Sequence, residues 1–416
     1  MLKTSYDCIV MGGGPGGSTV AALVADAGRD VLLIDREKFP RFVVGESLMP
    51  ETYWTFERLG VLDKMKASSF VRKASVQFVS PSGKESQPFY FPDHDPRESS
   101  QTWQVERSQF DKMLWDNAAE KSAECHDETR AIEVLFDSPG PADTRAHGVR
   151  IQSADGTRRE IQARVVVDAT GQRSLIAGAL GIRRVNPDLK KAAIWTYYRS
   201  ARREPGLHGG ATTILLTPDK QAWFWTIPLS NDVTSVGVVA DHDYLFKQRD
   251  LKGRGTPADV FAAELDQCPA LADRLADAEC IDQHRVMKEF SYSTQQVAGD
   301  GWVLVGDAWG FIDPIYSSGV FFALKSGEMA ADCIIEGLRQ NDTSAAQLGK
   351  WADEFVAGTE WIRKLVRAFY SPSFSFGRFM KAYPQHQGHL TDLLIGRIFE
   401  PGIEELFKDM DSWISS

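Results

Sequence analysis

The 416-residue chain lacks several features that mark particular protein classes. Its five cysteines are scattered, odd in number and without a CxxC pair, which favours a reducing compartment and no metal site. No stretch reaches the roughly 18–20 apolar residues that a membrane span needs. A formal charge of −10 argues against a nucleic-acid-binding surface and against adhesion to anionic lipid. The N-terminus shows no basic leader and no small-residue cleavage site, so we expect a cytoplasmic protein.

The pattern of apolar and polar residues along the chain predicts an α/β fold with an inserted second domain. The segment Tyr6–Glu37 reads as strand, glycine turn, helix and parallel strand. From about residue 191 the pattern changes to the period-2 alternation of an antiparallel sheet, which we interpret as a substrate domain. We therefore expect a Rossmann-like parallel sheet over 1–190 and 285–340, the antiparallel insert over 191–284, and a helical C-terminal region over 341–416. A further helix is predicted over Ser108–Ser122, with Ser108 as its N-cap.

The six residues that directly follow the first predicted strand fit the pattern GxGxxG: Gly12-Gly13-Gly14-Pro15-Gly16-Gly17. Gly12 permits a tight turn, Gly14 lets the backbone approach a pyrophosphate, and Gly17 lets helix and strand pack closely. The phosphates then face a helix N-terminus, where free N–H groups favour negative charge. Asp35 ends the second strand, where an acid can accept hydrogen bonds from ribose hydroxyls. The alternative is a glycine-rich turn without a ligand, but the strand context and the acid favour a dinucleotide.

Two later segments, "VVVDATGQRS" (Val165–Ser174) and "VLVGDAWGFIDP" (Val303–Pro314), resemble signatures of flavoproteins. With the glycine motif and "GRDVLLIDR", the chain resembles FAD-dependent enzymes of the glutathione-reductase-like fold, in the aromatic-hydroxylase branch. The alternative for Asp307 is an N-cap of the next helix. The resemblance implies that FAD is held by Gly12, Gly14, Gly17, Asp35, Arg36, Glu46, Ser47, Arg107, Asp168, Gly171, Gly306, Asp307, Pro314 and Gly319.

Three motifs indicate which family of FAD-dependent enzymes the chain resembles. "AWFWTIPL" (222–229) contains the WxWxIP motif of flavin-dependent halogenases, and "FIDPIYSSG" (311–319) matches their pattern F-x-x-P-x-x-S-x-G. "FVRKASVQF" (70–78) places Lys73 where these enzymes carry a catalytic lysine. "GESLMP" (45–50) occurs both in these halogenases and in geranylgeranyl reductase-like enzymes, so it does not distinguish the two families. The chain resembles the phenol- and pyrrole-acting branch of the flavin-dependent halogenases.

The resemblance implies that FADH2 and O2 form a C4a-hydroperoxide, which chloride or bromide attacks to release hypohalous acid. Side chains at alternate positions of a strand share a face, so Trp223 and Trp225, followed by Ile227 and Pro228, would separate the flavin from the organic substrate. The alternative is plain core packing of two tryptophans. The acid would travel through a tunnel to Lys73, which polarises it or forms a chloramine and which must be buried to do so.

Lys73 taken alone would more often be a solvated surface lysine. The halide is expected at Ser317, Ser318 and Gly319, at the start of a long helix, where the alternative is a simple N-cap by a serine. No position matches the glutamate base of the tryptophan-acting branch, and we interpret Glu46 and Asp313 as local caps or supports of the flavin pocket. The aromatic segment 355–376 is either a lid or packing.

The expected substrate is a small electron-rich phenol or pyrrole ring, either free or tethered to an acyl carrier protein. We find no second nucleotide-binding fingerprint, so reduced flavin is expected from a separate NAD(P)H flavin reductase. Two rival enzyme functions on the same scaffold are an aromatic hydroxylase and a reductase of isoprenoid double bonds. A third possibility is a non-enzymatic flavoprotein. The two rival enzymes would not need Lys73 or the tryptophan pair, and the non-enzymatic flavoprotein would need no halide.

Overall fold

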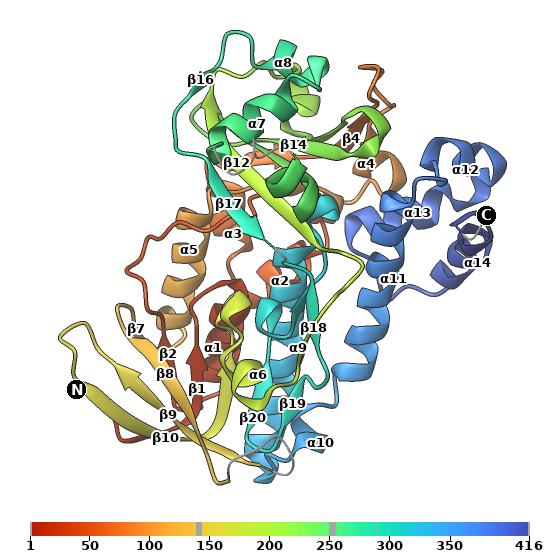
Figure 1. Ribbon diagram of the computed structural model, residues 1–416. Helices are drawn as coiled ribbons and strands as arrows, with labels where there is room; N and C mark the ends of the chain where they lie inside the picture. Colours follow the sequence, from red (N-terminus) through yellow and green to blue (C-terminus); the bar gives the residue numbers. More distant parts are fainter. Residues whose placement is uncertain (1, 139–143, 249–254, 289, 415–416) are drawn as a thin grey trace.

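The computed structural model describes residues 2–138, 144–248, 255–288 and 290–414 (Figure 1). Its first sheet has the strand order β19-β20-β10-β1-β2-β7, with β8 and β9 forming an antiparallel arm on β10. Pairing is parallel from β20 through β7, and the central strands β1 and β2 are apolar on both faces, as is typical of parallel sheets. The strands are β1 (Ser5–Met11), β2 (Val31–Ile34), β7 (Glu124–His126), β8 (Arg130–Phe136), β9 (Ala146–Gln152), β10 (Arg158–Asp168), β19 (Ala298–Gly299) and β20 (Trp302–Leu304).

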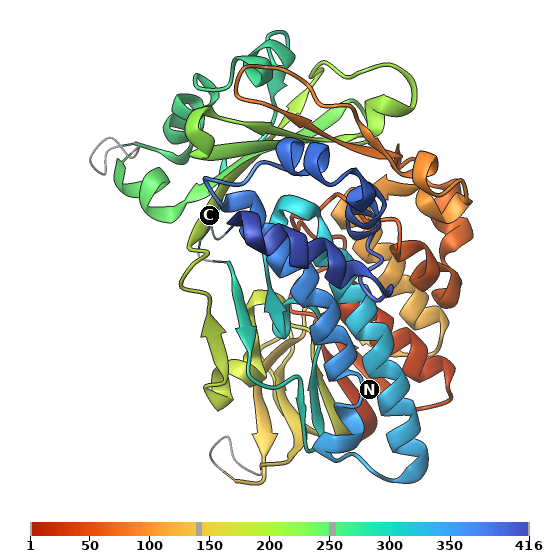
Figure 2. The same ribbon diagram turned by 90° about the vertical axis from the view of Figure 1, so that its right-hand side faces the viewer.

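Helix α1 (Pro15–Asp26) packs between α5 (Arg107–Glu120) and α9 (Ser318–Gln340), which brings distant parts of the chain beside the glycine turn (Figure 2). The predicted N-cap of α5 was wrong. The helix begins at Arg107, and its N-cap is Glu106, two residues before Ser108, with no side-chain capping bond. Arg107 is drawn into the first turn because its guanidinium pairs with Asp111 one turn later.

The second sheet has the order β16-β12-β15-β14-β13-β4-β5, with β17 also paired to β12. One face packs on α7 (Pro257–Leu265) and α8 (Pro269–Arg274), and these helices lie at the top of Figure 1. Three of its strands come from outside the segment 191–284: β4 and β5 precede it, and β17 directly follows it. The strands are β4 (Ser75–Val79), β5 (Phe89–Tyr90), β12 (Lys191–Arg199), β13 (Thr212–Leu216), β14 (Ala222–Pro228), β15 (Val233–Asp241), β16 (Glu279–Cys280) and β17 (Arg285–Lys288).

The remaining elements connect or cover the two sheets. Two small sheets consist of β3 (Val71–Lys73) with β6 (Thr102–Gln104), and of β11 (Arg183–Val185), β18 (Tyr292–Thr294) and β21 (Gly310–Phe311). The short helices are α2 (Thr52–Leu59), α3 (Leu62–Ala67), α4 (Phe91–His94) and α6 (Leu175–Leu180). Single 3-10 turns occur at Glu98–Ser100, Gly171–Arg173, Gly206–Gly210, Pro218–Lys220, Gly306–Ala308, Pro314–Tyr316 and Pro384–His386, and a π-turn at Tyr244–Gln248.

The C-terminal region is helical and lies along one side of both sheets, drawn in blue in Figures 1 and 2. Its helices are α10 (Ala345–Leu348), α11 (Ala352–Tyr370), α12 (Phe376–Ala382), α13 (Gln387–Ile395) and α14 (Ile403–Ile414). Among the described residues, no helix is both long and apolar enough to cross a bilayer. The architecture is the predicted one: a parallel sheet, a second sheet that is antiparallel except for the β4–β13 pair, and a helical C-terminal region.

Candidate active site

A cavity of about 780 Å³ extends from the carboxyl ends of the parallel strands to the inner face of the second sheet. The turns after β1, β2, β10 and β20 line one end, which is where open parallel sheets bind their ligands. Strands β12, β13 and β14 line the other end with Trp195, Ile214 and the tryptophans of the WxWxIP motif. One continuous space therefore joins the dinucleotide-binding turn to the second sheet.

The glycine turn is shaped for close backbone approach. Gly12 has φ +105°, and a Cβ there would lie 2.2 Å from the carbonyl oxygen of Ala169. A Cβ on Gly17 would lie 1.9 Å from the carbonyl oxygen of Gly12. Gly14 is the N-cap of α1 and faces the cavity, so no capping side chain competes for the N–H groups of Gly16 and Gly17. The turn is therefore a ready site for a phosphate.

Asp35 is held at the end of β2 by two backbone donors. Its Oδ2 accepts from Gly13 N at 2.8 Å, and its Oδ1 accepts from Glu37 N at 2.9 Å. Arg41 lies 3.4 Å from the same carboxylate and bridges it to Asp111 at 3.1 Å. The carboxylate lines the cavity in a fixed orientation.

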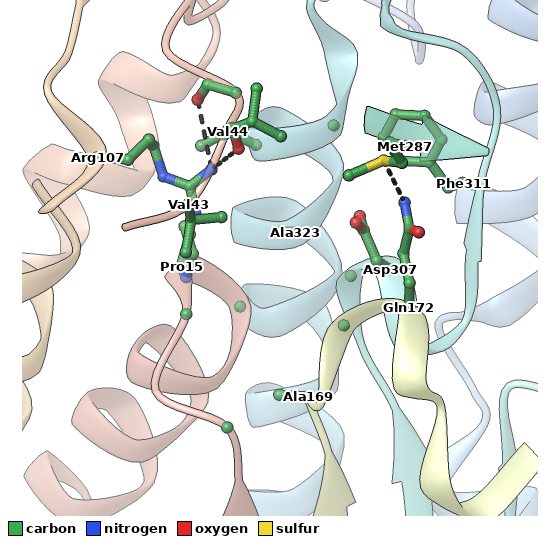
Figure 3. Close-up of a pocket in the computed structure, with 18 of the residues that line it drawn as sticks. Pro15, Val43, Val44, Arg107, Ala169, Gln172, Met287, Asp307, Phe311 and Ala323 are labelled. Atoms are coloured by element: carbon green, nitrogen blue, oxygen red, sulfur yellow. Dashed lines mark hydrogen bonds between the residues drawn. The ribbon is translucent and has the colours of Figure 1, made fainter. Parts of the chain in front are cut away.

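Arg107 and Asp307 lie on opposite sides of the cavity (Figure 3). Arg107 forms two bonds with Asp111, Nε to Oδ1 at 2.8 Å and Nη2 to Oδ2 at 3.0 Å, and its Nη1 donates to the carbonyl of Val44 at 2.7 Å. This fork fixes the loop that precedes Glu46. Burial raises the pKa of Asp307 to about 6, and the positive charge of Arg107 opposes that rise. Beside Asp307, the Gln172 amide contacts the Met287 sulfur at 3.3 Å (Figure 3).

Glu46 lies in the cavity wall between Arg107 and the second sheet. Its Oε1 accepts from the hydroxyl of Tyr197, on β12, at 2.7 Å. Burial raises the pKa of Glu46, and the bond from Tyr197 opposes that rise. Glu46 Oε2 accepts from Gly45 N at 3.2 Å, so Glu46 is a buried carboxyl held by the second sheet and by its own loop.

The alternation along β14 divides its side chains between two environments. Trp223, Trp225 and Ile227 line the cavity, and the two indole rings lie 6.2 Å apart. Phe224 faces the other way and packs on Phe261 of α7 at 5.6 Å. Pro228 shares that opposite face and lines a separate small pocket, so it is not in the cavity wall.

Lys73 lies behind the cavity wall and is only 1% exposed. Its Nζ donates to Ser47 Oγ at 2.8 Å and to the carbonyl of Leu48 at 2.9 Å. Ser47 Oγ also lies 2.9 Å from Thr212 Oγ1, and both hydroxyl residues line the cavity. Burial lowers the pKa of Lys73 to about 7. Lys73 is therefore a buried amine separated from the cavity by one hydroxyl group, and not a solvated surface lysine.

The loop before α9 also reaches the cavity. Pro314, Ser317 and Gly319 line it, whereas Ser318 is buried outside it. Ser317 occupies the N-cap position of α9 with φ +57°, but its side chain makes no capping bond. Asp313 instead caps the preceding 3-10 turn, since its Oδ1 accepts from Ile315 N at 3.0 Å.

Comparison with known proteins assigns this arrangement to a family. The FAD binding domain family matches residues 5–341. The chain is 31% identical to a 1H-pyrrole-2-carbonyl-[peptidyl-carrier protein] brominase of Pseudoalteromonas luteoviolacea, over 95% of this chain and 93% of the relative. It is also 31% identical to the corresponding chlorinase of Pseudomonas fluorescens, over 100% of this chain and 94% of the relative. The chain belongs to the flavin-dependent halogenases.

Solved structures agree with this assignment. The flavin-dependent brominase Bmp2 superposes with a TM-score of 0.86 at 30% identity, over 98% of each chain. The myxobacterial chondrochloren halogenase CndH superposes with a TM-score of 0.80 at 29% identity, over 99% of this chain and 97% of that one. The protein is accordingly an enzyme that binds FAD.

The cavity of this halogenase fits FAD in its donor set as well as in its extent. The glycine turn offers backbone N–H groups to a pyrophosphate, Asp35 offers acceptors to a ribose, and Asp307 lies farther along the same space. The predicted site residues that line it are Gly12, Gly14, Gly17, Asp35, Arg36, Glu46, Ser47, Arg107, Gly171, Trp223, Trp225, Ile227, Gly306, Asp307, Pro314, Ser317 and Gly319. The predicted site residues outside the lining are Lys73, Asp168, Pro228 and Ser318.

Asp168 of the halogenase lies beneath the wall and holds its shape. Its carboxylate accepts from the backbone N–H groups of Thr170 at 3.0 Å and Ile176 at 2.7 Å. Asp307 lies within a 3-10 turn and is not the N-cap of the next helix. Sequence reasoning missed other lining residues: Phe42, Val43, Trp195, Thr212, Met287 and Phe290. These residues belong to no short motif, and the local signal for Trp195 and Thr212 is their position in alternating strands.

Proposed function

We propose that this halogenase produces hypohalous acid from FADH2, O2 and chloride or bromide, and that the acid passes the tryptophans to Lys73. There it halogenates an electron-rich ring. The observation that carries the proposal is the buried Lys73 amine, one hydroxyl group behind a cavity that fits FAD. The names of the first two relatives favour a pyrrole-2-carbonyl group carried on a carrier protein as the substrate. A separate NAD(P)H flavin reductase would supply FADH2.

The chain's own residues perform four tasks in this proposal. The glycine turn and Asp35 bind the pyrophosphate and a ribose, and Arg107 holds the loop that carries Glu46 and Ser47. The loop 314–319 offers backbone N–H groups to the halide at the start of α9. Bound reduced FAD, with O2 and halide, supplies hypohalous acid. Trp223 and Trp225 keep the organic ring away from the place where that acid forms, which prevents direct hydroxylation.

Lys73 acts at the far side of the wall. With a pKa near 7, the amine is present in both protonation states at neutral pH. As an ammonium it hydrogen-bonds and polarises hypohalous acid, and as a neutral amine it attacks the halogen to form a chloramine with loss of water. In either case, halogen transfer to a ring carbon is followed by loss of that carbon's proton. A pyrrole or phenol ring is reactive enough to need no dedicated base.

The variant Lys73→Ala tests this role. We expect ring halogenation to fall by about a hundredfold or more, because a positioned proton donor or nucleophile is lost. FAD affinity and halide-dependent halogenation of a small diffusible trap should persist, since Lys73 does not line the cavity. Lys64→Ala, which changes an exposed lysine on α3, is the control. Ring halogenation at the wild-type rate in purified Lys73→Ala would remove Lys73 from the mechanism.

A further inference from the structure

A tyrosine from the C-terminal helices contacts the tryptophan wall, the part of the cavity wall formed by Trp223 and Trp225. Tyr370 is the last residue of α11, beyond the segment that matches the FAD binding domain family. Its hydroxyl accepts from Trp223 Nε1 at 2.9 Å and donates to Asp313 Oδ2 at 3.0 Å. Trp223 is 2% exposed and Asp313 is 1% exposed. The Tyr370 hydroxyl therefore connects the buried side chains of Trp223 and Asp313, which are 90 residues apart in sequence.

Both ends of this connection lead to the cavity. Trp223 lines it directly from β14, and Asp313 caps the turn that carries the lining residues Pro314 and Ser317. The Phe369 ring packs edge-on against Trp223 at 6.1 Å, so α11 contacts the indole through a ring as well as a hydroxyl. The Lys191 ammonium lies 4.0 Å from the centre of the Tyr370 ring and pairs with Asp241 at 2.8 Å.

The two tryptophans of the wall are anchored differently. Trp225 Nε1 donates at 3.1 Å to Ser235 Oγ, on the neighbouring strand of the same sheet. Trp223 Nε1 donates to Tyr370, which belongs to another layer of the molecule. A buried N–H that loses its acceptor is costly, so the hydrogen bond to Tyr370 favours the observed orientation of the Trp223 ring.

We infer that Tyr370 is a positioning residue for the halogenase reaction, holding the Trp223 indole against the Asp313 loop so that the oxidant is directed to Lys73. This inference rests on the proposed function, because it assumes that the wall separates the oxidant from the organic substrate. Among the described residues, none of the helices α10–α14 lines the cavity, so the C-terminal helices contribute to the site through Trp223 and Asp313.

The test is Tyr370→Phe, with Tyr6→Phe as a matched control. Tyr6 is a buried tyrosine at the start of β1, whose hydroxyl likewise accepts from a nitrogen, Lys3 N at 3.1 Å, and donates to a carboxylate, Glu124 at 2.7 Å. In FAD-free protein labelled with 15N-tryptophan, the Trp223 indole N–H is assigned by its loss in Trp223→Phe. We expect Tyr370→Phe to speed its hydrogen exchange by about fivefold or more, as the loss of one hydrogen bond implies, and Tyr6→Phe to leave it unchanged.

The second readout is the partition of oxidant between the ring substrate and monochlorodimedone in the loaded enzyme. Tyr370→Phe should shift this partition toward the trap while FAD affinity stays constant. Trp223→Phe keeps a ring but removes the N–H. The double variant, Trp223→Phe with Tyr370→Phe, should show the same partition as either single variant, because the effects of two substitutions that remove the same hydrogen bond do not add.

The outcomes separate the inference from the proposed function. An unchanged hydrogen-exchange rate of the Trp223 indole in Tyr370→Phe, or additive effects of the two substitutions on the partition, overturns the inference. Faster exchange with an unchanged partition overturns the positioning role. If wild-type enzyme forms no hypohalous acid at all, the proposed function and the positioning role fail together, whereas the exchange rate still reports whether Tyr370 anchors Trp223.

Discussion

Replacing Lys73 by methionine should stabilise the protein at neutral pH and progressively less at higher pH. The ammonium is removed from water by Phe91 and the surrounding core, and the closest polar partners of Nζ are Ser47 Oγ and the carbonyl of Leu48. Burial therefore lowers the pKa of Lys73 from 10.5 to about 7. Methionine has a similar volume and shape but carries no charge to bury.

The sign and size follow from proton linkage. Between pH 7 and pH 10.5 the unfolded chain binds more protons at Lys73 than the folded chain does, so wild-type stability rises with pH in this window and is lowest below pH 7. The full shift corresponds to about 5 kcal/mol, of which about 2.5 kcal/mol falls between pH 9 and pH 6. Methionine also leaves the Leu48 carbonyl without its lysine donor, a cost of about 1–3 kcal/mol that does not vary with pH.

The assay is urea unfolding of FAD-free wild type and Lys73→Met at several values between pH 6 and pH 9. Relative to the variant, the wild type should lose about 2.5 kcal/mol of unfolding free energy as the pH falls across this range. Lys84→Met, a change at an exposed turn, is the control and should show a pH-independent difference. A pH-independent difference for Lys73→Met as well would refute the buried, weakly basic amine and the mechanism that uses it.

Three further predictions concern the cavity. Gly14→Ala should leave the stability of FAD-free protein unchanged, since the nearest atom to an added Cβ is Arg41 Nη2 at 3.6 Å. The same variant should weaken FAD binding by about tenfold in a fluorescence titration, because the added methyl group would occupy the space through which the pyrophosphate approaches the backbone. Arg107→Lys should also weaken FAD binding by about tenfold, because a lysine cannot hold Asp111 and the Val44 carbonyl together; unchanged affinity would contradict this role. Trp225→Ala should increase the share of hypohalous acid that reaches a solvent trap, and an unchanged share would show that this indole is only packing.

Local sequence was enough to predict the glycine turn and the strand ends that line one end of the cavity. The strand, glycine turn, helix and second strand are consecutive, and each glycine role depends on backbone geometry within a few residues, as at Gly12 and Gly17. The two tryptophans of the WxWxIP motif share a face because strand alternation fixes the direction of side chains.

Long-range packing accounts for what the sequence did not indicate. Trp223 and Tyr370 are 147 residues apart, and Lys73 and Ser47 are 26 apart, so neither pairing leaves a periodic signal. The second sheet likewise recruits β4 and β5 from before the inserted segment, through a parallel pairing of β4 with β13. The predicted N-cap of α5, Ser108, lies two residues after the observed one, Glu106, and helix ends commonly differ from a sequence-based prediction by one or two residues.

The most direct test of the central claim is to mix FADH2-loaded enzyme with O2 in a stopped-flow instrument, with and without bromide, in the absence of organic substrate. Flavin reoxidation is followed by absorbance, and monochlorodimedone reports hypohalous acid. The account predicts bromide-dependent reoxidation accompanied by brominated trap, in wild type and in Lys73→Ala alike. Reoxidation that is indifferent to bromide and yields only hydrogen peroxide would contradict it.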